Sequence, residues 1–306
     1  MFQTIRVDRS AAEAMEWMGT KRKFWFSNAG VRWLFKAEER GTGEDWAEKI
    51  ACELASKLGI PHVNYELAEE YEGKTYLHPG VICPDFAGKP PNLILGNQLL
   101  WDRDPSYPRE NVQKYKVKAH TVDAVAACVS QLNPPSEEWV ANLPNGINTA
   151  LEIFTGYTMF DVLIANQDRH HENWGAVRVP DQSTLQLAPS FDHGASLARN
   201  LTDEERKDRL HSKDVKRQIS HFSQRARSSF YQGPTDARPL STFEAFREFA
   251  EQTPEAARIW LDMLAGVTDK EICAIVDEVP SERMSPITKE FTTELILINR
   301  NRLLTR

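Results

Sequence analysis

The sequence predicts an α+β protein of two lobes, with a small β-rich N-terminal lobe that carries one helix and a larger, mainly helical C-terminal lobe. Strand-like segments gather in about the first 80 residues, and a Pro- and Gly-rich stretch follows at residues 83–92. Helical periodicity dominates beyond that stretch. We therefore expect lobes at residues 1–85 and 86–306, separated by a deep cleft.

The bulk composition excludes several classes of protein. The chain has 306 residues, is 41% hydrophobic and carries a net charge of -7. This apolar content suffices for a core, and the acidic balance argues against direct nucleic-acid binding. The sequence contains no apolar run long enough to span a membrane, and its start lacks the apolar core of a signal peptide. Its 4 cysteines show no C-x-x-C spacing, which indicates reduced thiols in a cytoplasmic protein.

The strands of the N-terminal lobe are predicted from two segments. Residues 23–36, KFWFSNAGVRWLFK, indicate a β-hairpin, because aromatic and β-branched residues flank the turn signal SNAG. Residues 62–82, HVNYELAEEYEGKTYLHPGVI, indicate two more strands around a turn at Glu72 and Gly73.

A helix is expected between these strand pairs, in GTGEDWAEKIACELASKLGIP at residues 41–61. Its apolar residues recur at helical spacing. Thr42 is the predicted N-cap, with Asp45 following in the first turn. Gly59 and Pro61 mark the end of the helix.

The C-terminal lobe is predicted to be mostly helical, with one embedded β-hairpin. The hairpin strands are NWGAVRV and LQLAPSF, joined by the turn PDQS at residues 180–183. The helical segments are residues 122–132, 150–167, 242–252, 255–266, 270–279 and 287–304.

Polar side chains concentrate where the longest apolar helix ends, in IANQDRHHENWGAV at residues 164–177. Asp168 and Asn173 lie in this loop, and Asp192 follows the embedded hairpin in SFDHG. Because the hairpin reverses the chain, we expect Asp192 to lie beside Asn173. Such oxygen ligands suit Mg²⁺ completed by water and phosphate. Asp168 is then placed to orient a hydroxyl for in-line attack.

The N-terminal lobe offers positive charge for phosphates, which phosphoryl transfer requires. The basic segment GTKRK precedes the first strand of the predicted hairpin, and Lys36 ends the second strand. A lysine at such a position binds phosphates and pairs with an acid on the following helix. Glu48 and Glu44 are the candidate acids.

Together these motifs resemble the HipA-like serine/threonine kinases, the toxin kinases of bacterial toxin–antitoxin modules. NQDRHHENW resembles the family's catalytic loop, and LAPSFDHG its metal-binding segment. LFK resembles the segment with the ATP-binding lysine, and EKIACELASKLGIP the first helix, where the family register favours Glu48. The chain looks like a short, core-kinase form, and GTKRK lacks the serine that longer relatives autophosphorylate, with Thr20 as the remaining hydroxyl.

The resemblance implies a two-lobed protein-kinase-like fold, use of ATP and Mg²⁺, and transfer to a protein hydroxyl. It implies a catalytic role for Asp168, His170 and Asn173, and Mg²⁺ ligation by Asn173 and Asp192. The ATP-binding set is Gly19, Thr20, Lys21, Arg22, Lys23, Lys36 and Glu48. Family analogy suggests a translation component, such as an aminoacyl-tRNA synthetase, as the protein substrate, and an antitoxin as a partner.

Two other functions stay open from the sequence. One is a small-molecule phosphotransferase of the aminoglycoside or fructosamine kinase kind, which shares the two-lobed plan and the Asp, Asn and Asp set. The other is a non-catalytic nucleotide-binding pseudokinase, because a fold alone does not give a function. A zinc site at His170 and His171 is disfavoured, because adjacent histidines point apart on most backbones.

Overall fold

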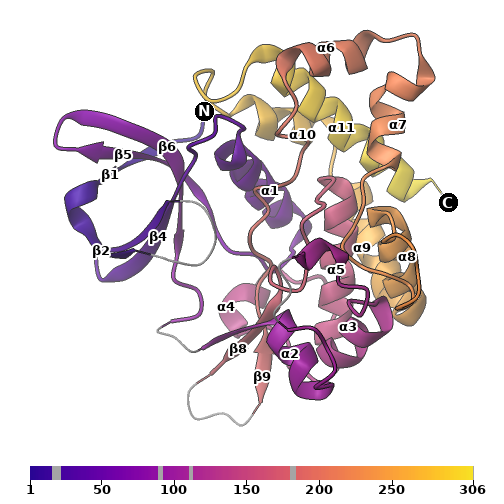
Figure 1. Cartoon of the computed structure of the whole chain (residues 1–306). Helices are drawn as coiled ribbons and strands as arrows, with labels where there is room; N and C mark the ends of the chain where they lie inside the picture. The colour runs from indigo at the N-terminus through magenta and orange to yellow at the C-terminus, as the bar shows by residue number, and fades with distance from the viewer. Residues whose placement is uncertain (16–21, 89–91, 110–112, 180–183, 306) are drawn as a thin grey trace.

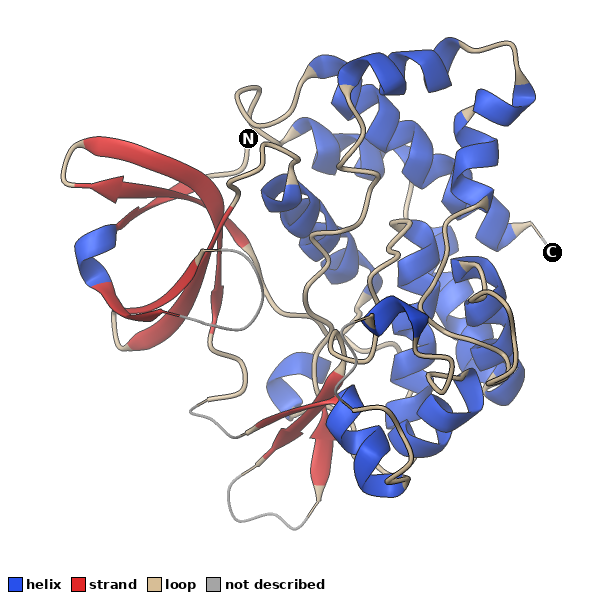
Figure 2. Ribbon diagram, viewed as in Figure 1, coloured by secondary structure: helices blue, strands red, loops and turns tan. Residues whose placement is uncertain are grey.

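The computed structural model describes residues 1–15, 22–88, 92–109, 113–179 and 184–305. A β-sheet forms the N-terminal lobe and helices form most of the C-terminal lobe, which confirms the predicted α+β, two-lobed fold (Figures 1 and 2).

The N-terminal sheet has 6 strands in the order β1-β5-β6-β4-β3-β2. β1 is parallel to β5, and the other neighbouring strands are antiparallel. The predicted hairpins are confirmed as β3 with β4 and β5 with β6, whereas β1 and β2 were not predicted. The strands are β1 (Thr4–Asp8), β2 (Ala12–Met15), β3 (Lys23–Asn28), β4 (Val31–Ala37), β5 (Glu66–Glu72) and β6 (Thr75–Pro84).

The predicted helix of this lobe is α1 (Glu44–Leu58), and it lies between the sheet and the other helices (Figure 1). Its Cys52 packs in the cluster under the sheet, while Trp46, Ile50 and Leu54 join the core of the helical lobe. Arg283, in the connection between α10 and α11, pairs with Asp45 of this helix and donates to a β5 carbonyl. Contacts on both faces therefore fix α1 as the element on which the sheet and the helical lobe meet.

The predicted N-cap of α1 is wrong. The N-cap is Gly43, at a φ of 82°, and it makes no side-chain cap bond. A Cβ on Gly43 would meet the Trp46 indole at 1.9 Å, so glycine is required there. The carboxylate of Glu38 does the capping instead, because it accepts the backbone N–H groups of Arg40 at 2.8 Å, Thr42 at 3.3 Å and Glu44 at 2.6 Å.

The six helices predicted for the C-terminal lobe are all present, and β8 and β9 form the predicted hairpin. The helices are α2 (Gly96–Arg103), α3 (Val122–Val129), α4 (Glu137–Val140), α5 (Ala150–Leu163), α6 (Asp203–His211), α7 (Ile219–Gln224), α8 (Thr242–Gln252), α9 (Pro254–Gly266), α10 (Asp269–Asp277) and α11 (Pro286–Leu304). β7 (Leu93–Leu95), β8 (Gly175–Arg178) and β9 (Leu185–Leu187) form a small antiparallel sheet. Short 3-10 turns are η1 (Arg9–Ala11), η2 (Lys114–Lys116) and η3 (Val215–Arg217).

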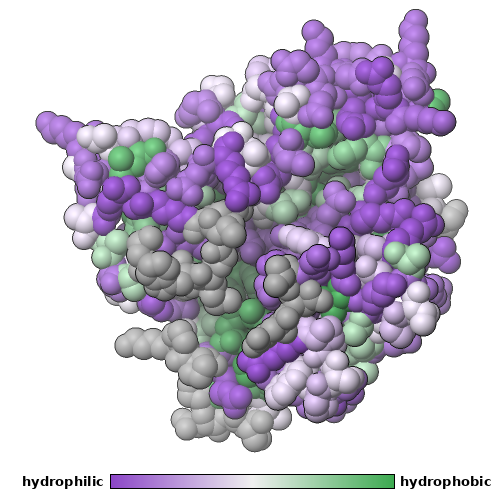
Figure 3. Space-filling model, viewed as in Figure 1, coloured by the Kyte–Doolittle hydropathy of each residue, from purple (hydrophilic) through white to green (hydrophobic). Residues whose placement is uncertain are grey.

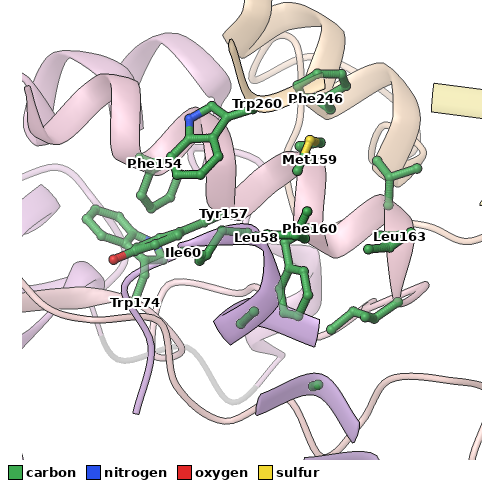
Figure 4. Close-up of a cluster of buried hydrophobic side chains, with 14 of the residues drawn as sticks. Leu58, Ile60, Phe154, Tyr157, Met159, Phe160, Leu163, Trp174, Phe246 and Trp260 are labelled. Carbon is green, nitrogen blue, oxygen red and sulfur yellow. The ribbon is translucent and has the colours of Figure 1, made fainter. Parts of the chain in front are cut away.

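α5 is the central helix of this lobe. Phe154, Tyr157 and Phe160 are at most 1% exposed, and Figure 4 shows them with Trp174 and Trp260 in one apolar cluster. Burial on all sides fixes the position at which α5 ends, and therefore the position of the polar loop that follows it. The face seen in Figure 3 is mostly hydrophilic. Among the described helices, none is long and apolar enough to cross a membrane.

Candidate active site

The predicted site residues meet in a cleft of about 310 Å³. The cleft lies between the N-terminal sheet, α1 and two polar loops, one after α5 with Asp168 and one after β9 with Asp192. Those that line it are Lys23, Lys36, Glu48, Asp168, His170, Asn173 and Asp192. A larger hollow of about 860 Å³ lies among α6, α7, α10 and α11, but it contains none of these residues. The smaller cleft is therefore the candidate active site.

Lys36 lies at the centre of the cleft's sheet side. Its Nζ donates to Glu48 Oε1, Tyr65 Oη and Asp192 Oδ1, each at 3.2 Å. Burial opposes the charge, but Asp192 and then Tyr65 and Glu48 favour it, so the pKa of Lys36 stands well above its ordinary value. The ammonium is therefore a fixed positive charge that faces the polar loops.

Glu48 connects this lysine to the loop that carries Asp192. One carboxylate oxygen accepts from Lys36, and the other accepts the backbone N–H of His193 at 2.9 Å. Burial raises the pKa of Glu48, and Lys36 opposes that shift. The other candidate acid, Glu44, pairs with Arg199 instead. The geometry thus assigns Glu48 to Lys36.

The loop after α5 is held by a buried ion pair. Arg169 donates to both oxygens of Asp161, at 2.8 and 2.7 Å, and both side chains are at most 6% exposed. Asn166 donates to Asp161 at 2.8 Å and accepts the N–H of Asp168 at 3.0 Å. Asn173 closes the loop by donating its amide to the Asp168 carbonyl at 2.8 Å. These bonds fix the loop at Asp168 and Asn173, two of the three predicted catalytic residues, without using the Asp168 carboxylate.

The two adjacent histidines face different neighbours. His170 Nε2 lies 3.4 Å from Asp168 Oδ1, and its Nδ1 accepts from the Glu172 N–H at 3.1 Å. His171 instead pairs with the Tyr107 hydroxyl at 2.8 Å. Burial, followed by Lys114, lowers the pKa of His170 to about 3. His170 is therefore neutral and directs its Nε2–H toward Asp168, which restricts the position of the carboxylate.

Asp192 adopts an uncommon backbone conformation, with a φ of 60°. Buried neighbours hold it there: Ser190 bonds the ring of His193 at 2.7 Å, and the hydroxyl of Tyr65 lies 3.4 Å from the Asp192 N–H. A residue held in this region by its surroundings is frequent at functional sites. The conformation places the Asp192 carboxylate in the cleft beside Lys36.

The basic segment GTKRK, which is predicted to bind phosphates, is described only in part. Gly19, Thr20 and Lys21 lie outside the described residues. The guanidinium of Arg22 binds both oxygens of Glu70, at 3.1 and 2.7 Å, and Arg22 does not line the described cleft. Lys23 does line it.

Sequence patterns missed several residues that the fold brings into the cleft. Arg40, Lys114 and Arg199 add positive charge, and Tyr115 lines the same space. The hydroxyl of Tyr65 accepts a hydrogen bond from Lys36. These residues lie in separate segments of the chain and share no spacing, so only the fold brings them together.

The donor atoms fit a magnesium ion that arrives with phosphates. Asn173 uses its amide nitrogen within the loop, which leaves its carboxamide oxygen for the cleft together with the Asp192 carboxylate. Mg²⁺ commonly takes one or two carboxylates and completes its shell with water and phosphate. No group of 3 or more His, Cys, Asp or Glu suited to a metal occurs among the described residues. The site is thus unlike an all-protein metal cage.

The fold is similar to that of solved kinases. The Helicobacter pylori proinflammatory kinase CtkA matches with a TM-score of 0.66 and 19% identity, over 99% of this chain and 98% of CtkA. Shewanella oneidensis HipA, from a complex with HipB and operator DNA, matches with a TM-score of 0.55 and 12% identity, over 94% of this chain and 64% of HipA. No family model matches the sequence, and no curated protein matches it significantly. At these identities the likeness establishes a protein-kinase-like fold.

Proposed function

We propose that this protein is an ATP- and Mg²⁺-dependent phosphotransferase that acts on serine or threonine hydroxyls of a protein. One observation carries the proposal. Lys36, held by Glu48 and Asp192, lies in the same cleft as the rigid loop of Asp168 and Asn173. Phosphoryl transfer needs this combination of fixed positive charge, oxygen ligands and a carboxylate for the acceptor.

The sheet side of the cleft binds the nucleotide in this proposal. Lys36 contacts the phosphates, and Glu48 keeps its ammonium in place. Lys23, Arg40 and Arg199 add charge where the phosphates would lie. Asn173 and Asp192 hold Mg²⁺, which neutralises phosphate charge when bound.

The loop side acts on the acceptor. Asp168 accepts a hydrogen bond from the acceptor hydroxyl, orients it and takes its proton as the new bond forms. Neutral His170 restricts the carboxylate through its Nε2, which lies 3.4 Å from Asp168 Oδ1. The buried pair of Asp161 and Arg169 keeps the loop rigid and takes no part in the chemistry.

The acceptor and the partner stay predictions. The resemblance to toxin kinases supports a translation component, such as an aminoacyl-tRNA synthetase, as the substrate. The similar HipA was solved with HipB, which supports a search for an antitoxin partner of this chain.

The test is incubation of the purified chain with labelled ATP and Mg²⁺, with and without cell lysate, beside an Asp192→Asn variant. We expect label on protein that is absent with the variant. Label only on aminoglycosides or fructosamine sugars, in a parallel incubation, would identify a small-molecule phosphotransferase. Tight nucleotide binding without turnover would identify a pseudokinase.

A further inference from the structure

Positive charge is concentrated at the outer edge of the helical lobe, where α6, η3 and α7 follow one another (Figure 1). Residues 207–227 contain 7 lysines and arginines but only 2 aspartates, which gives them a net charge of +5. Because the whole chain carries -7, the other residues together carry -12. A merely solvated surface normally mixes both signs of charge, so this separation needs another explanation. We call residues 207–227 the cationic surface.

Side-chain contacts join the three elements into one continuous surface. Arg217 of η3 binds both oxygens of Asp208 on α6, at 3.0 and 2.5 Å. The guanidinium of Arg209 on α6 lies 4.5 Å from the centre of the Phe222 ring on α7. Both helices pack on α11 through a small apolar cluster. Arg209 and Arg217 therefore have a structural role.

The other exposed cations have no comparable role. Four of them form no ion pair with any residue of the described chain: Lys207, Lys213, Lys216 and Arg225. Between two of these lysines, Val215 is 66% exposed. Like charges repel one another, so unpaired cations at this density do not stabilise the folded chain. An anionic partner would relieve the repulsion and cover the valine.

The cationic surface also forms one wall of the larger hollow, whose volume is about 860 Å³. The apolar part of its lining includes Leu210, Ile219 and Ile298. The opposite wall carries Glu290 and Glu294 of α11, which repel acidic groups from the interior. A partner that fits both features therefore places its carboxylates on the rim formed by α6 and η3, and an apolar side chain in the hollow.

We propose that the cationic surface docks an acidic segment of a protein, and that this protein is the acceptor of the phosphoryl group. The inference rests on the proposed function. The surface reaches the loop of the candidate active site, because the Arg227 N–H donates to the Gln167 carboxamide at 3.2 Å and Gln167 directly precedes Asp168. An acceptor docked on it has its hydroxyls at a raised local concentration near the cleft.

A nucleic acid or a membrane fits this surface less well than a protein segment. Each presents negative charge over a wider area than three short elements cover, and the charge of -12 on the other residues repels it. The exposed Val215 and the apolar lining of the hollow suit side chains, as in the apolar centre of a protein interface with a polar rim.

The experiment compares two triple variants of the full chain that change the net charge equally. One carries Lys207→Glu, Lys213→Glu and Lys216→Glu in the cationic surface. The matched control reverses three exposed cations elsewhere, with Lys74→Glu, Arg103→Glu and Lys270→Glu. Thermal unfolding and Mg²⁺-ATP titration check that each variant is folded and binds nucleotide.

The probe is a fluorescent peptide of glutamate and leucine, and its anisotropy gives the affinity at low and at high salt. We expect wild-type binding to weaken with salt, because charge attraction drives it. The first variant should bind at least about tenfold more weakly, with the control near the wild type. Transfer of label to lysate proteins should fall in the first variant only, with its Mg²⁺-ATP affinity unchanged.

The other outcomes overturn separate parts of the inference. Equal loss of peptide binding in both variants would refute the cationic surface as the docking site. Tighter binding of a single-stranded oligonucleotide or of phosphatidylserine vesicles, lost in the first variant, would refute a protein partner. Unchanged transfer to lysate proteins, with peptide binding lost, would refute the acceptor as that partner. Peptide binding that depends on the surface, in a folded chain that transfers no label, would refute the proposed function and leave the docking surface standing.

Discussion

The two sides of the cleft are built on different principles. On the sheet side, Lys36, Glu48 and Asp192 hold one another, so the groups proposed to bind nucleotide and metal also maintain the geometry. On the loop side, Asp168 is positioned through its backbone N–H, and the buried ion pair of Asp161 and Arg169 stabilises the loop. A substitution of Asp168 can therefore remove the reactive group without changing the loop. A substitution of Lys36, Glu48 or Asp192 changes both the binding groups and their geometry.

The largest effect on activity is expected from Asp168→Asn. The substitution keeps the shape of the side chain and leaves the loop's backbone bonds intact, but it removes the base. Positioned general bases contribute about 10²- to 10⁴-fold in rate. We expect transfer to fall by about that factor, with Mg²⁺-ATP affinity and unfolding free energy near those of the wild type. Single-turnover transfer, nucleotide titration and urea unfolding measure the three quantities.

Removal of Arg169 should instead destabilise the chain. Arg169→Met leaves Asp161 buried without its charge partner, and breaking such a pair costs about 3–5 kcal/mol. The double variant Asp161→Leu with Arg169→Met should recover much of that loss, because no lone buried charge remains. Urea unfolding measures both variants. A single variant as stable as the wild type would show that the pair does not hold the loop.

Acid should weaken both sides, because each holds a buried neutral histidine. Burial lowers the pKa of His170 to about 3, and it lowers the pKa of His193 well below its ordinary value. The unfolded chain takes up protons near pH 6.5 while the folded chain does not, so stability is full above that pH and is lost as the pH falls toward 3. Each histidine lowers the free energy of unfolding by about 1.4 kcal/mol for each pH unit below 6.5. Urea unfolding between pH 7 and 5 should show a smaller slope for His170→Gln than for the wild type.

On the sheet side, Glu48→Gln should impair binding. It removes a charged partner from Lys36 and weakens the bond to the His193 N–H, and hydrogen bonds to charged groups contribute about 1.5–3 kcal/mol. We expect Mg²⁺-ATP affinity to fall by about 10- to 100-fold. Glu44→Gln, one turn earlier on the same helix, is the matched control and should have the smaller effect, because Glu44 pairs with Arg199. Equal losses in the two variants would contradict the assignment of Glu48 to Lys36.

The smallest effect is expected from Thr42→Ala, which tests the corrected start of α1. Thr149 caps α5 through a complete capping box, so Thr149→Ala should cost about 1 kcal/mol. Thr42 makes no such cap bond, although its hydroxyl accepts a hydrogen bond from Arg199, so its replacement should leave the start of α1 in place and cost less. Thermal unfolding of both variants makes the comparison.

Local patterns predicted much of the fold, and together with the resemblance they indicated the residues proposed to act. The β-hairpins, α1 and the six C-lobe helices follow from periodicity and turn residues, and the resemblance pointed to Lys36, Glu48, Asp168, Asn173 and Asp192. The sequence also led us to expect Asp192 beside Asn173 and Lys36 beside an acid of α1, whereas the contact between Lys36 and Asp192 came only from the structure. β1 was missed because it is short and pairs with β5, about 60 residues later. The N-cap of α1 was assigned wrongly because the capping carboxylate of Glu38 lies upstream of any standard capping motif.

Long-range contacts account for the rest. Lys36 meets Asp192 across 156 residues, and Tyr107 meets His171 across 64, distances at which spacing carries no signal. The same holds for Tyr115 and Arg199, which enter the cleft from segments with no recognised motif. The sequence therefore predicted the groups proposed to act, but not the groups that hold or flank them.

The most direct test of the account combines transfer and nucleotide binding in Asp168→Asn and Lys36→Met. We expect Asp168→Asn to bind Mg²⁺-ATP like the wild type but to transfer phosphate to protein about 10²- to 10⁴-fold more slowly, whereas Lys36→Met loses binding. A folded Asp168→Asn variant that transfers phosphate at the wild-type rate would contradict the central claim.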